Sequence, residues 1–186
     1  MLRLALCYIP AVVRRALVWV LAPLLAISGC GYQLVRYQDA LGDARRVAIH
    51  GLVNDSFEPG LDSLVSDAIG REFTRRGALE VVSDPELADL IITGSIARVR
   101  TRPTSFSSIQ FVLEFRVRMT LNLEVQRPDG TELPIGRRVL SAMELYQASA
   151  DVEVTRTNRK EALRRLAGIL AARFHDALFE QLIPPP

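Results

Sequence analysis

The sequence predicts an α+β fold: a two-layer sandwich in which two amphipathic helices pack on one face of a mostly antiparallel sheet of four or five strands. Residues 111–125 alternate between apolar and polar side chains, the pattern of a long strand with one buried face. Residues 61–77 and 158–183 instead repeat apolar side chains every three or four positions, the pattern of a helix with one buried face. The order β-α-β-β-β-β-α follows, and the apolar faces of sheet and helices cover each other.

The first half of the domain is predicted from turn residues as well as from periodicity. A β-rich stretch stops at the turn cluster Asn54-Asp55-Ser56. The first helix opens after Pro59-Gly60, ends at Gly77 and carries one apolar stripe. A segment rich in Ser, Thr and Pro reads as a loop. We therefore expect strands at residues 45–53, 79–82 and 90–99, a helix at 61–77, and a loop at 103–108.

The second half is predicted as a hairpin followed by a helix. Arg127-Pro128-Asp129-Gly130 has the chemistry of a turn, and residues 133–145 return as the partner strand, with Pro134 indicating an edge or a bulge. Asn158 and Glu161 have the spacing of a capping box, so the last helix is expected to begin there. Its apolar stripe consists of Leu163, Leu166, Leu170, Phe174, Ala177 and Leu178.

The N-terminal segment has the features of a secretory signal peptide. Residues 1–29 contain three arginines and no acid, and a twelve-residue apolar run, residues 16–27, precedes Ser28-Gly29-Cys30. That run would span only about 18 Å as a helix, which is short for a bilayer core of about 30 Å. An N-terminal membrane anchor extended by residues 4–13 is the alternative, although Arg14 and Arg15 interrupt it.

Ile27-Ser28-Gly29-Cys30 resembles the lipobox of bacterial lipoproteins. The resemblance implies cleavage between Gly29 and Cys30 and lipidation of Cys30, and several acyl chains on one residue would anchor the protein stably. Gly31, rather than Asp, implies sorting to the outer membrane. We expect a signal peptide at residues 1–29, a lipidated N-terminus and tether at 30–44, a single α+β domain at 45–183 and an extended tail at 184–186.

Removal of the signal peptide changes the charge of the chain. The precursor of 186 residues carries +2, but residues 30–186 contain 20 basic and 21 acidic residues, a net charge of −1. The overall charge therefore gives no reason to expect a nucleic-acid partner. One cysteine and two histidines remain after residue 29, which is too few for a disulfide framework or a Cys/His metal site.

Residues 30–186 contain none of the common nucleotide-binding, metalloprotease, hydrolase or redox motifs. His50, in the first strand beside Gly51, is interpreted as structural, and His175, between Arg173 and Asp176, is expected on a solvated helix face. We therefore expect no enzymatic activity and no cofactor.

Two features favour a binding function. Fifteen alternating residues reach about 50 Å as a strand, whereas the two predicted helices reach only about 26 and 39 Å. The apolar face of the hairpin is thus expected to extend beyond its helical cover, unless a bulge or coiling shortens the strand. Exposed apolar strand surface is typical of a partner or ligand site.

The second feature is a set of arginines on or near the predicted sheet. Arginine suits bidentate phosphate binding, and beside apolar surface it suits a phosphorylated lipid. The alternative is an ordinary solvated face balanced by Glu114 and Glu124. The arginines that end the third predicted strand and follow it occupy even-numbered positions, as do the core candidates Leu90, Ile92 and Ile96. Either a bulge near Gly94 turns the later even-numbered side chains to the other face of the sheet, or the strand leaves the core there. The candidate contacts for such a lipid are Arg98, Arg100, Arg102, Arg116, Arg118 and Arg127.

The chain resembles the LptE family of lipopolysaccharide-assembly lipoproteins. The resemblance rests on Cys30-Gly-Tyr-Gln-Leu34 at the expected mature start, on Asn54-Asp-Ser-Phe-Glu-Pro-Gly-Leu61, on Ala88-Asp-Leu-Ile-Ile-Thr-Gly94 and on Tyr146. It implies a non-enzymatic lipoprotein on the periplasmic side of the outer membrane. The resemblance also implies that the protein plugs and helps to assemble a translocon formed by an LptD-like β-barrel, and that it binds lipopolysaccharide.

A second resemblance leads to a different function. CsgG-like domains and activators of peptidoglycan synthases share the strand–Asn-x-Ser–helix and Ala-Asp…Gly patterns. They imply a periplasmic adaptor of a cell-wall synthase or secretion complex. The Cys-Gly-Tyr start and the long hairpin favour the first interpretation.

Overall fold

The computed structural model describes residues 43–182 apart from residues 78, 109–110, 132 and 134–137. Contacts divide the chain into two units, Met1–Val35 and Arg36–Pro186, and every described residue belongs to the second. The expected signal peptide, Gly29, Cys30 and the C-terminal tail lie outside the described residues. The elements are β1 (Arg46–Asn54), α3 (Leu61–Arg76), β2 (Glu80–Val82), the short 3₁₀ helix η1 (Pro85–Leu87), β3 (Leu90–Ile96), β4 (Arg100–Phe106), β5 (Val112–Gln126), β6 (Arg138–Gln147) and α4 (Val152–Leu182).

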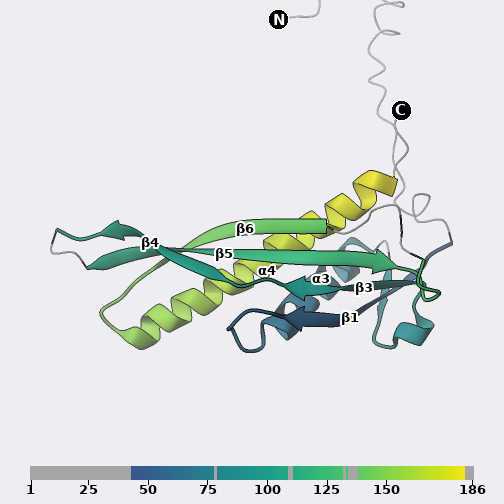
Figure 1. Cartoon of the computed structure of the whole chain (residues 1–186), viewed down its shortest axis with the longest axis horizontal. Coiled ribbons are helices and arrows are strands. Elements are labelled where there is room, and N and C mark those ends of the chain that lie inside the picture. The colour runs from purple at the N-terminus through teal and green to yellow at the C-terminus, as the bar shows by residue number, and fades with distance from the viewer. Residues whose placement is uncertain (1–42, 78, 109–110, 132, 134–137, 183–186) are drawn as a thin grey trace, which may run out of the picture. The chain divides into compact units, whose positions relative to one another are not determined.

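The fold is α+β, as predicted, and its sheet is mixed (Figure 1). β1 runs parallel to β2 and β3, whereas β5 pairs antiparallel with β3, β4 and β6. β3 pairs with the C-terminal half of β5 and β4 with its N-terminal half, along one edge, because β6 occupies the other edge over both halves. The described residues form six strands, more than the four or five expected.

The additional strand, β4, includes residues that we expected in a loop. Pro103, Thr104 and Ser105 have low strand propensity, but they pair with Phe115 and Glu114 of β5 or lie between those pairs. β4 is an edge strand, and an edge strand tolerates the missing N–H of Pro103. Backbone pairing with the long strand β5 therefore decided the conformation of residues 103–105, against their low strand propensity.

The last helix begins six residues earlier than expected, at Val152 rather than Asn158. The carboxylate of Asp151 accepts a hydrogen bond of 2.8 Å from the backbone N–H of Glu153, as an N-capping side chain does. Asn158 lies inside the helix and donates to the carbonyl of Gln147. The predicted capping box is therefore wrong, because the exposed first turn, with Val152 and Val154, has no apolar stripe to indicate a helix.

Both helices lie on one face of the sheet, and the core lies between the two layers (Figure 1). The alternation of β5 is confirmed from Val117 onward: the side chains of Val117, Met119, Leu121 and Leu123 are fully buried. Phe73 of α3 and Phe174 of α4 join the helices, with ring centroids 6.3 Å apart. Since the buried hydrophobic residues of the described part run from Ala44 to Phe179, a chain that starts at residue 30 retains this whole core.

The free edge of β6 is covered by side chains of α4. Alternate carbonyls of an edge strand point away from its paired neighbour, and three such carbonyls, all at odd positions of β6, accept hydrogen bonds from the helix. Asn158 donates to Gln147 (3.0 Å), Arg165 to Leu145 (3.5 Å) and Arg173 to Ser141 (2.8 Å). The helix thus covers part of the edge as well as the face of the sheet.

Candidate functional site: an arginine face on the open side of the sheet

A β-bulge places the arginines on the face of the sheet away from the helices. Ile96 pairs with Leu121, but Arg100 pairs with Arg118, so the register shifts by one residue across Ala97–Val99. Before the shift the even-numbered side chains Leu90, Ile92 and Ile96 are buried, and after it the even-numbered side chains face outward. A bulge therefore does change the face, as one of our two alternatives required, but it lies beyond Gly94.

Gly94 has a separate role. Its φ of +151° lies in a region that favours glycine, and a Cβ at this position would lie 2.0 Å from the carbonyl oxygen of Asn122 on β5. Glycine therefore permits the close approach of β3 and β5.

Two pairs of arginines lie directly opposite each other across β4 and β5: Arg100 with Arg118 and Arg102 with Arg116. Like charges in directly opposite positions of a sheet are destabilising. Within the described ranges, none of these four guanidinium groups has an ion-pair partner. Glu114, which would balance this face in the alternative interpretation, accepts a hydrogen bond from the hydroxyl of Thr104 at 3.1 Å.

The arginines surround an open depression of about 680 Å³. Five of the six candidate residues line it, and Arg127 does not. Arg127 begins the turn after β5, nine residues beyond Arg118, and is separated from it by about 31 Å along the strand. The residues that line the depression are Ala97, Arg98, Arg100, Arg102, Arg116, Arg118, Thr120 and Met143.

An apolar stripe on β6 adjoins the arginines. Val139, Met143 and Leu145 are 66 %, 49 % and 43 % exposed, and Met143 and Leu145 pair with Arg118 and Arg116. The sulfur of Met143 lies 2.9 Å from a guanidinium nitrogen of Arg118. Apolar and cationic groups thus meet on one surface, which suits an amphipathic anion. The sequence placed these residues in a strand, but their face depends on the register of β6 with β5.

Phe57 is a residue of this surface that the sequence analysis missed. It is 80 % exposed, and the guanidinium carbon of Arg98 lies 4.9 Å from its ring centroid, a cation–π contact. Asn54 orders the loop: its side chain donates to the carbonyl of Glu58 and accepts from the N–H and hydroxyl of Ser56. The Asn54–Leu61 segment therefore holds an aromatic ring at the margin of the arginine face.

Arg159 of α4 joins the same loop to the sheet. It forms an ion pair with Glu58 and donates hydrogen bonds to the hydroxyls of Thr101 (2.7 Å) and Tyr146 (3.3 Å). The Tyr146 ring in turn stacks on Phe115, with centroids 5.3 Å apart. This arginine is only 26 % exposed and has a carboxylate partner, so it fixes the structure around the arginine face.

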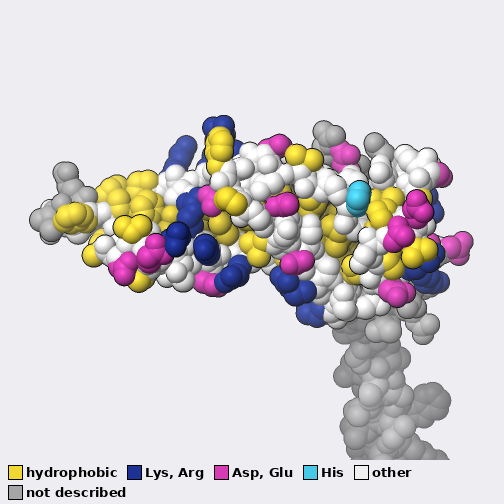
Figure 2. Space-filling model, turned by 90° about the horizontal axis from the view of Figure 1, so that it is seen from below, with side chains coloured by type: hydrophobic (Ala, Val, Ile, Leu, Met, Phe, Trp, Pro, Cys, Tyr) yellow, Lys and Arg dark blue, Asp and Glu magenta, His cyan; other side chains and the backbone are white. Residues whose placement is uncertain are grey.

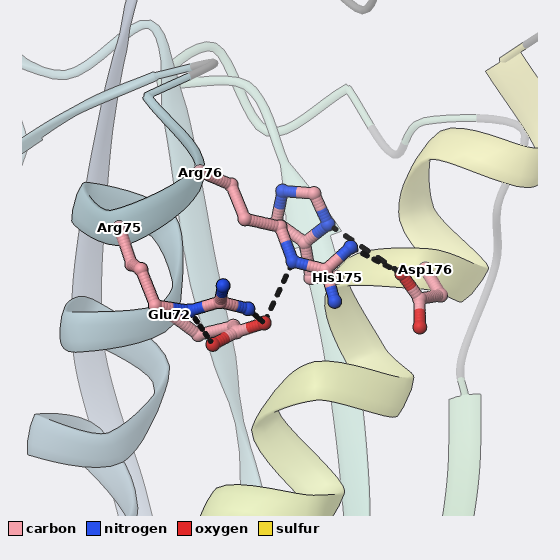
Figure 3. A network of polar contacts seen from close by, with 5 residues as sticks. All are labelled: Glu72, Arg75, Arg76, His175 and Asp176. Carbon is pink, nitrogen blue, oxygen red and sulfur yellow. Dashed lines mark hydrogen bonds and ion pairs between the residues drawn. The ribbon is translucent and has the colours of Figure 1, made fainter.

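A cluster of charged side chains also lies between the two helices (Figure 3). Glu72 binds Arg75 and Arg76, each at 2.6 Å, and Arg76 also reaches Asp176 at 2.5 Å. Hydrogen bonding from Arg75, together with Arg76, lowers the pKa of Glu72 to about 2. His175 is fully buried against Phe73 and Phe179, so the expectation of a solvated position is wrong. Burial, aided by the charge of Arg76, lowers its pKa to about 4.

The described residues offer neither a metal site nor a membrane-spanning helix. No group of His, Cys, Asp and Glu within these ranges could hold a metal ion. No described helix has both the length and the apolar composition to cross a bilayer. His50, in β1, is exposed.

In the described domain, helices cover one face of the sheet, and the other face is open, cationic and partly apolar. These features define a candidate binding protein for an amphipathic anion. Comparison with known proteins identifies the family. The chain matches the LptE family, described as lipopolysaccharide-assembly, over residues 44–178, and it belongs to that family. No curated protein matches the sequence.

Two solved structures illustrate the similarity in fold. A protein from Caulobacter crescentus described as a lipoprotein superposes with a TM-score of 0.51 at 12 % identity, over 80 % of this chain and 98 % of its own. The rare lipoprotein B from Shewanella oneidensis superposes with a TM-score of 0.50 at 13 % identity, over 74 % of this chain and 96 % of its own. Identities this low establish a shared fold only.

Proposed function

We propose that this protein is a non-enzymatic outer-membrane lipoprotein that plugs and helps to assemble a β-barrel lipopolysaccharide translocon and binds lipopolysaccharide. It would be anchored through Cys30 on the periplasmic side, after cleavage between Gly29 and Cys30. Membership of the lipopolysaccharide-assembly family supports the general role, and the lipobox-like residues 27–30 support the anchor. The partner would be an LptD-like barrel.

The observation that supports the proposed ligand is that two pairs of directly opposite arginines lie beside the apolar stripe of β6. Arg100–Arg118 and Arg102–Arg116 face each other without a carboxylate among the described residues, so a bound phosphate would relieve their repulsion. Met143 and Leu145 would contact acyl chains, since they are exposed next to the same arginines. We include Arg98 in this site and leave Arg127 outside it.

Lipopolysaccharide binding by a triple variant tests the site. Replacing Arg98, Arg100 and Arg102 by Ser should weaken binding strongly at low salt and less at high salt, because salt screens exposed charges. The charge-matched control replaces Arg75, Arg156 and Arg164, which are exposed but paired with carboxylates. Equal binding by the two triple variants at low salt would refute the arginine site.

Co-purification tests the partner. A C-terminally tagged chain extracted from membranes in mild detergent should retain an outer-membrane β-barrel protein. A peptidoglycan synthase in place of the barrel would contradict the proposal and support the adaptor function.

A further inference from the structure

The end of the β4–β5 hairpin is apolar and exposed. Phe106, Phe111 and Leu113 are 56 %, 65 % and 48 % exposed. Figure 1 shows this end of the hairpin extending past the N-terminal end of α4, and Figure 2 shows hydrophobic side chains gathered at the same end of the domain. We call Phe106, Phe111, Val112 and Leu113 the apolar tip.

Apolar side chains of both parities are present at the tip. Leu113 has the odd parity of the β5 residues that form the core from Val117 onward, and Phe111 directly precedes β5, where the pairing with β4 shifts register between Ser105 and Phe106. Val112 has the opposite parity and pairs directly with Phe106. A groove on a protein would cover one face of this hairpin, whereas a lipid layer surrounds both.

Two hydrogen bonds join Ser107 and Phe111 across the described part of the tip. The N–H of Ser107 donates to the carbonyl of Phe111 at 2.7 Å, and the N–H of Phe111 donates to the hydroxyl of Ser107 at 3.0 Å. Unsatisfied backbone groups are costly outside water. These local hydrogen bonds therefore reduce the free-energy cost of moving the tip out of water.

Arg102 and Arg116, which we call the collar, lie at a distance from the apolar tip that matches the depth of lipid headgroups. Arg102, paired with Arg116, lies four residues from Phe106, about 14 Å along the strand. Apolar side chains at an interface enter the acyl boundary by about 5–10 Å, which leaves these arginines level with lipid phosphates. Glu114 is the single acidic residue between Arg100 and Arg118, and its carboxylate is hydrogen-bonded to Thr104. The collar is therefore complementary to an anionic surface.

We propose that the apolar tip inserts into the interfacial region of an anionic lipid bilayer, with Arg102 and Arg116 at the level of the headgroups. The insertion is shallow and is separate from any anchor at Cys30. Insertion shares Arg102 and Arg116 with the proposed lipopolysaccharide site, but the apolar tip is outside that site and insertion is measured without lipopolysaccharide, so it can fail or hold independently of the proposed function.

A tryptophan reporter tests the insertion. Trp19 is the single Trp of the sequence and precedes residue 30, so residues 30–186 with Cys30→Ala and Phe111→Trp contain one Trp, at the tip. With vesicles of phosphatidylcholine and phosphatidylglycerol, we expect a blue shift of its emission and quenching by lipids brominated on the acyl chains. Pure phosphatidylcholine vesicles should give a much smaller change, because the collar then has no net anionic surface to bind.

Two variants of the reporter protein distinguish insertion of the tip from nonspecific adsorption of the protein to vesicles. Leu113→Ser should lower vesicle affinity by about tenfold or more, since burying one large apolar side chain is worth that much. Leu87→Ser removes a side chain of similar exposure, 53 %, from η1 and should leave affinity unchanged. An unshifted emission with anionic vesicles at low salt, or a shift seen only on adding a protein partner, would overturn the proposal. Equal losses in the two variants would also overturn it.

Discussion

The two arginine clusters of the domain differ in what faces each guanidinium. Between α3 and α4, Arg75 and Arg76 contact the carboxylates of Glu72 and Asp176. On the open face, Arg100 and Arg102 face Arg118 and Arg116 instead. The first cluster satisfies its charges within the fold and stabilises it, whereas the second leaves its cations available to a ligand. The same residue type thus stabilises the fold in one place and forms the proposed ligand site in the other.

The largest effect we expect concerns the buried histidine beside the first cluster. The pKa of His175 is lowered from 6.5 to about 4, so the unfolded chain binds a proton more readily than the folded one. The free energy of unfolding should therefore fall between about pH 6.5 and pH 4, by on the order of 3 kcal/mol. Urea denaturation at pH 7, 5.5 and 4 measures this loss.

His175→Phe should remove the dependence in that pH range, whereas His50→Phe, at an exposed position of β1, should retain it. A stability of the wild-type protein that stays constant from pH 7 to pH 4 would show that the charges of Glu72 and Asp176 compensate the burial of His175.

A smaller loss is expected from breaking the first cluster. Glu72→Gln leaves Arg75 and Arg76 without their shared carboxylate and should lower the free energy of unfolding at pH 7 by about 1 kcal/mol, because Arg75 is largely exposed. The lowered pKa of Glu72 implies that its contribution is present above about pH 4.5 and disappears as the pH falls towards 2. Chemical denaturation beside the control Glu86→Gln, on η1, is the measurement. If the two variants are equally stable, the first cluster does not stabilise the fold.

The converse change adds a carboxylate to the second cluster. Met143→Glu places it where the sulfur now contacts Arg118, so the domain without ligand should gain about 0.5 kcal/mol. Lipopolysaccharide binding should weaken at the same time, because the new carboxylate competes for the arginines. Leu87→Glu adds the same charge on η1 and should change neither property. A binding loss shared by both variants would indicate an effect of net charge alone.

The smallest effect is expected at Arg127. Because it lies at the opposite end of β5 from the depression, Arg127→Ser should leave lipopolysaccharide affinity nearly unchanged, while Arg100→Ser reduces it severalfold. Titration of both variants at low salt makes the comparison. Equal losses would mean that the ligand contacts both ends of the sheet.

The sequence predicted the fold where one pattern was sustained over many residues. The alternation of β5 and the stripe of α3 led directly to buried residues such as Val117 and Phe73. The start of α4 could not be predicted in the same way, because its first turn is exposed and rich in β-branched residues. The burial of His175 depends on its contact with Phe73 of α3, a residue 102 positions away, which the periodicity of one helix does not report.

The candidate site was predicted in its residue types rather than in its geometry. Arginines at alternate positions indicated a cationic surface, and the parity that they share with core residues indicated a bulge as one of two alternatives. The position of the bulge, at residues 97–99 rather than near Gly94, follows from the pairing of β3 and β4 with β5. Met143 and Leu145 join the site through the register of β6. Phe57 could have been suspected as an exposed aromatic in a turn, yet its contact with Arg98 connects residues 41 positions apart.

The hydrogen bonds from α4 to the edge of β6 limit how the sheet can grow. An exposed, regular strand edge invites another chain to add a strand. Here Asn158, Arg165 and Arg173 already occupy carbonyls along β6, β2 has three residues, and β4 carries Pro103 and two register shifts. Each outer edge is thus a poor template for strand addition. A domain built in this way resists the edge-to-edge association by which sheets of separate chains join into one.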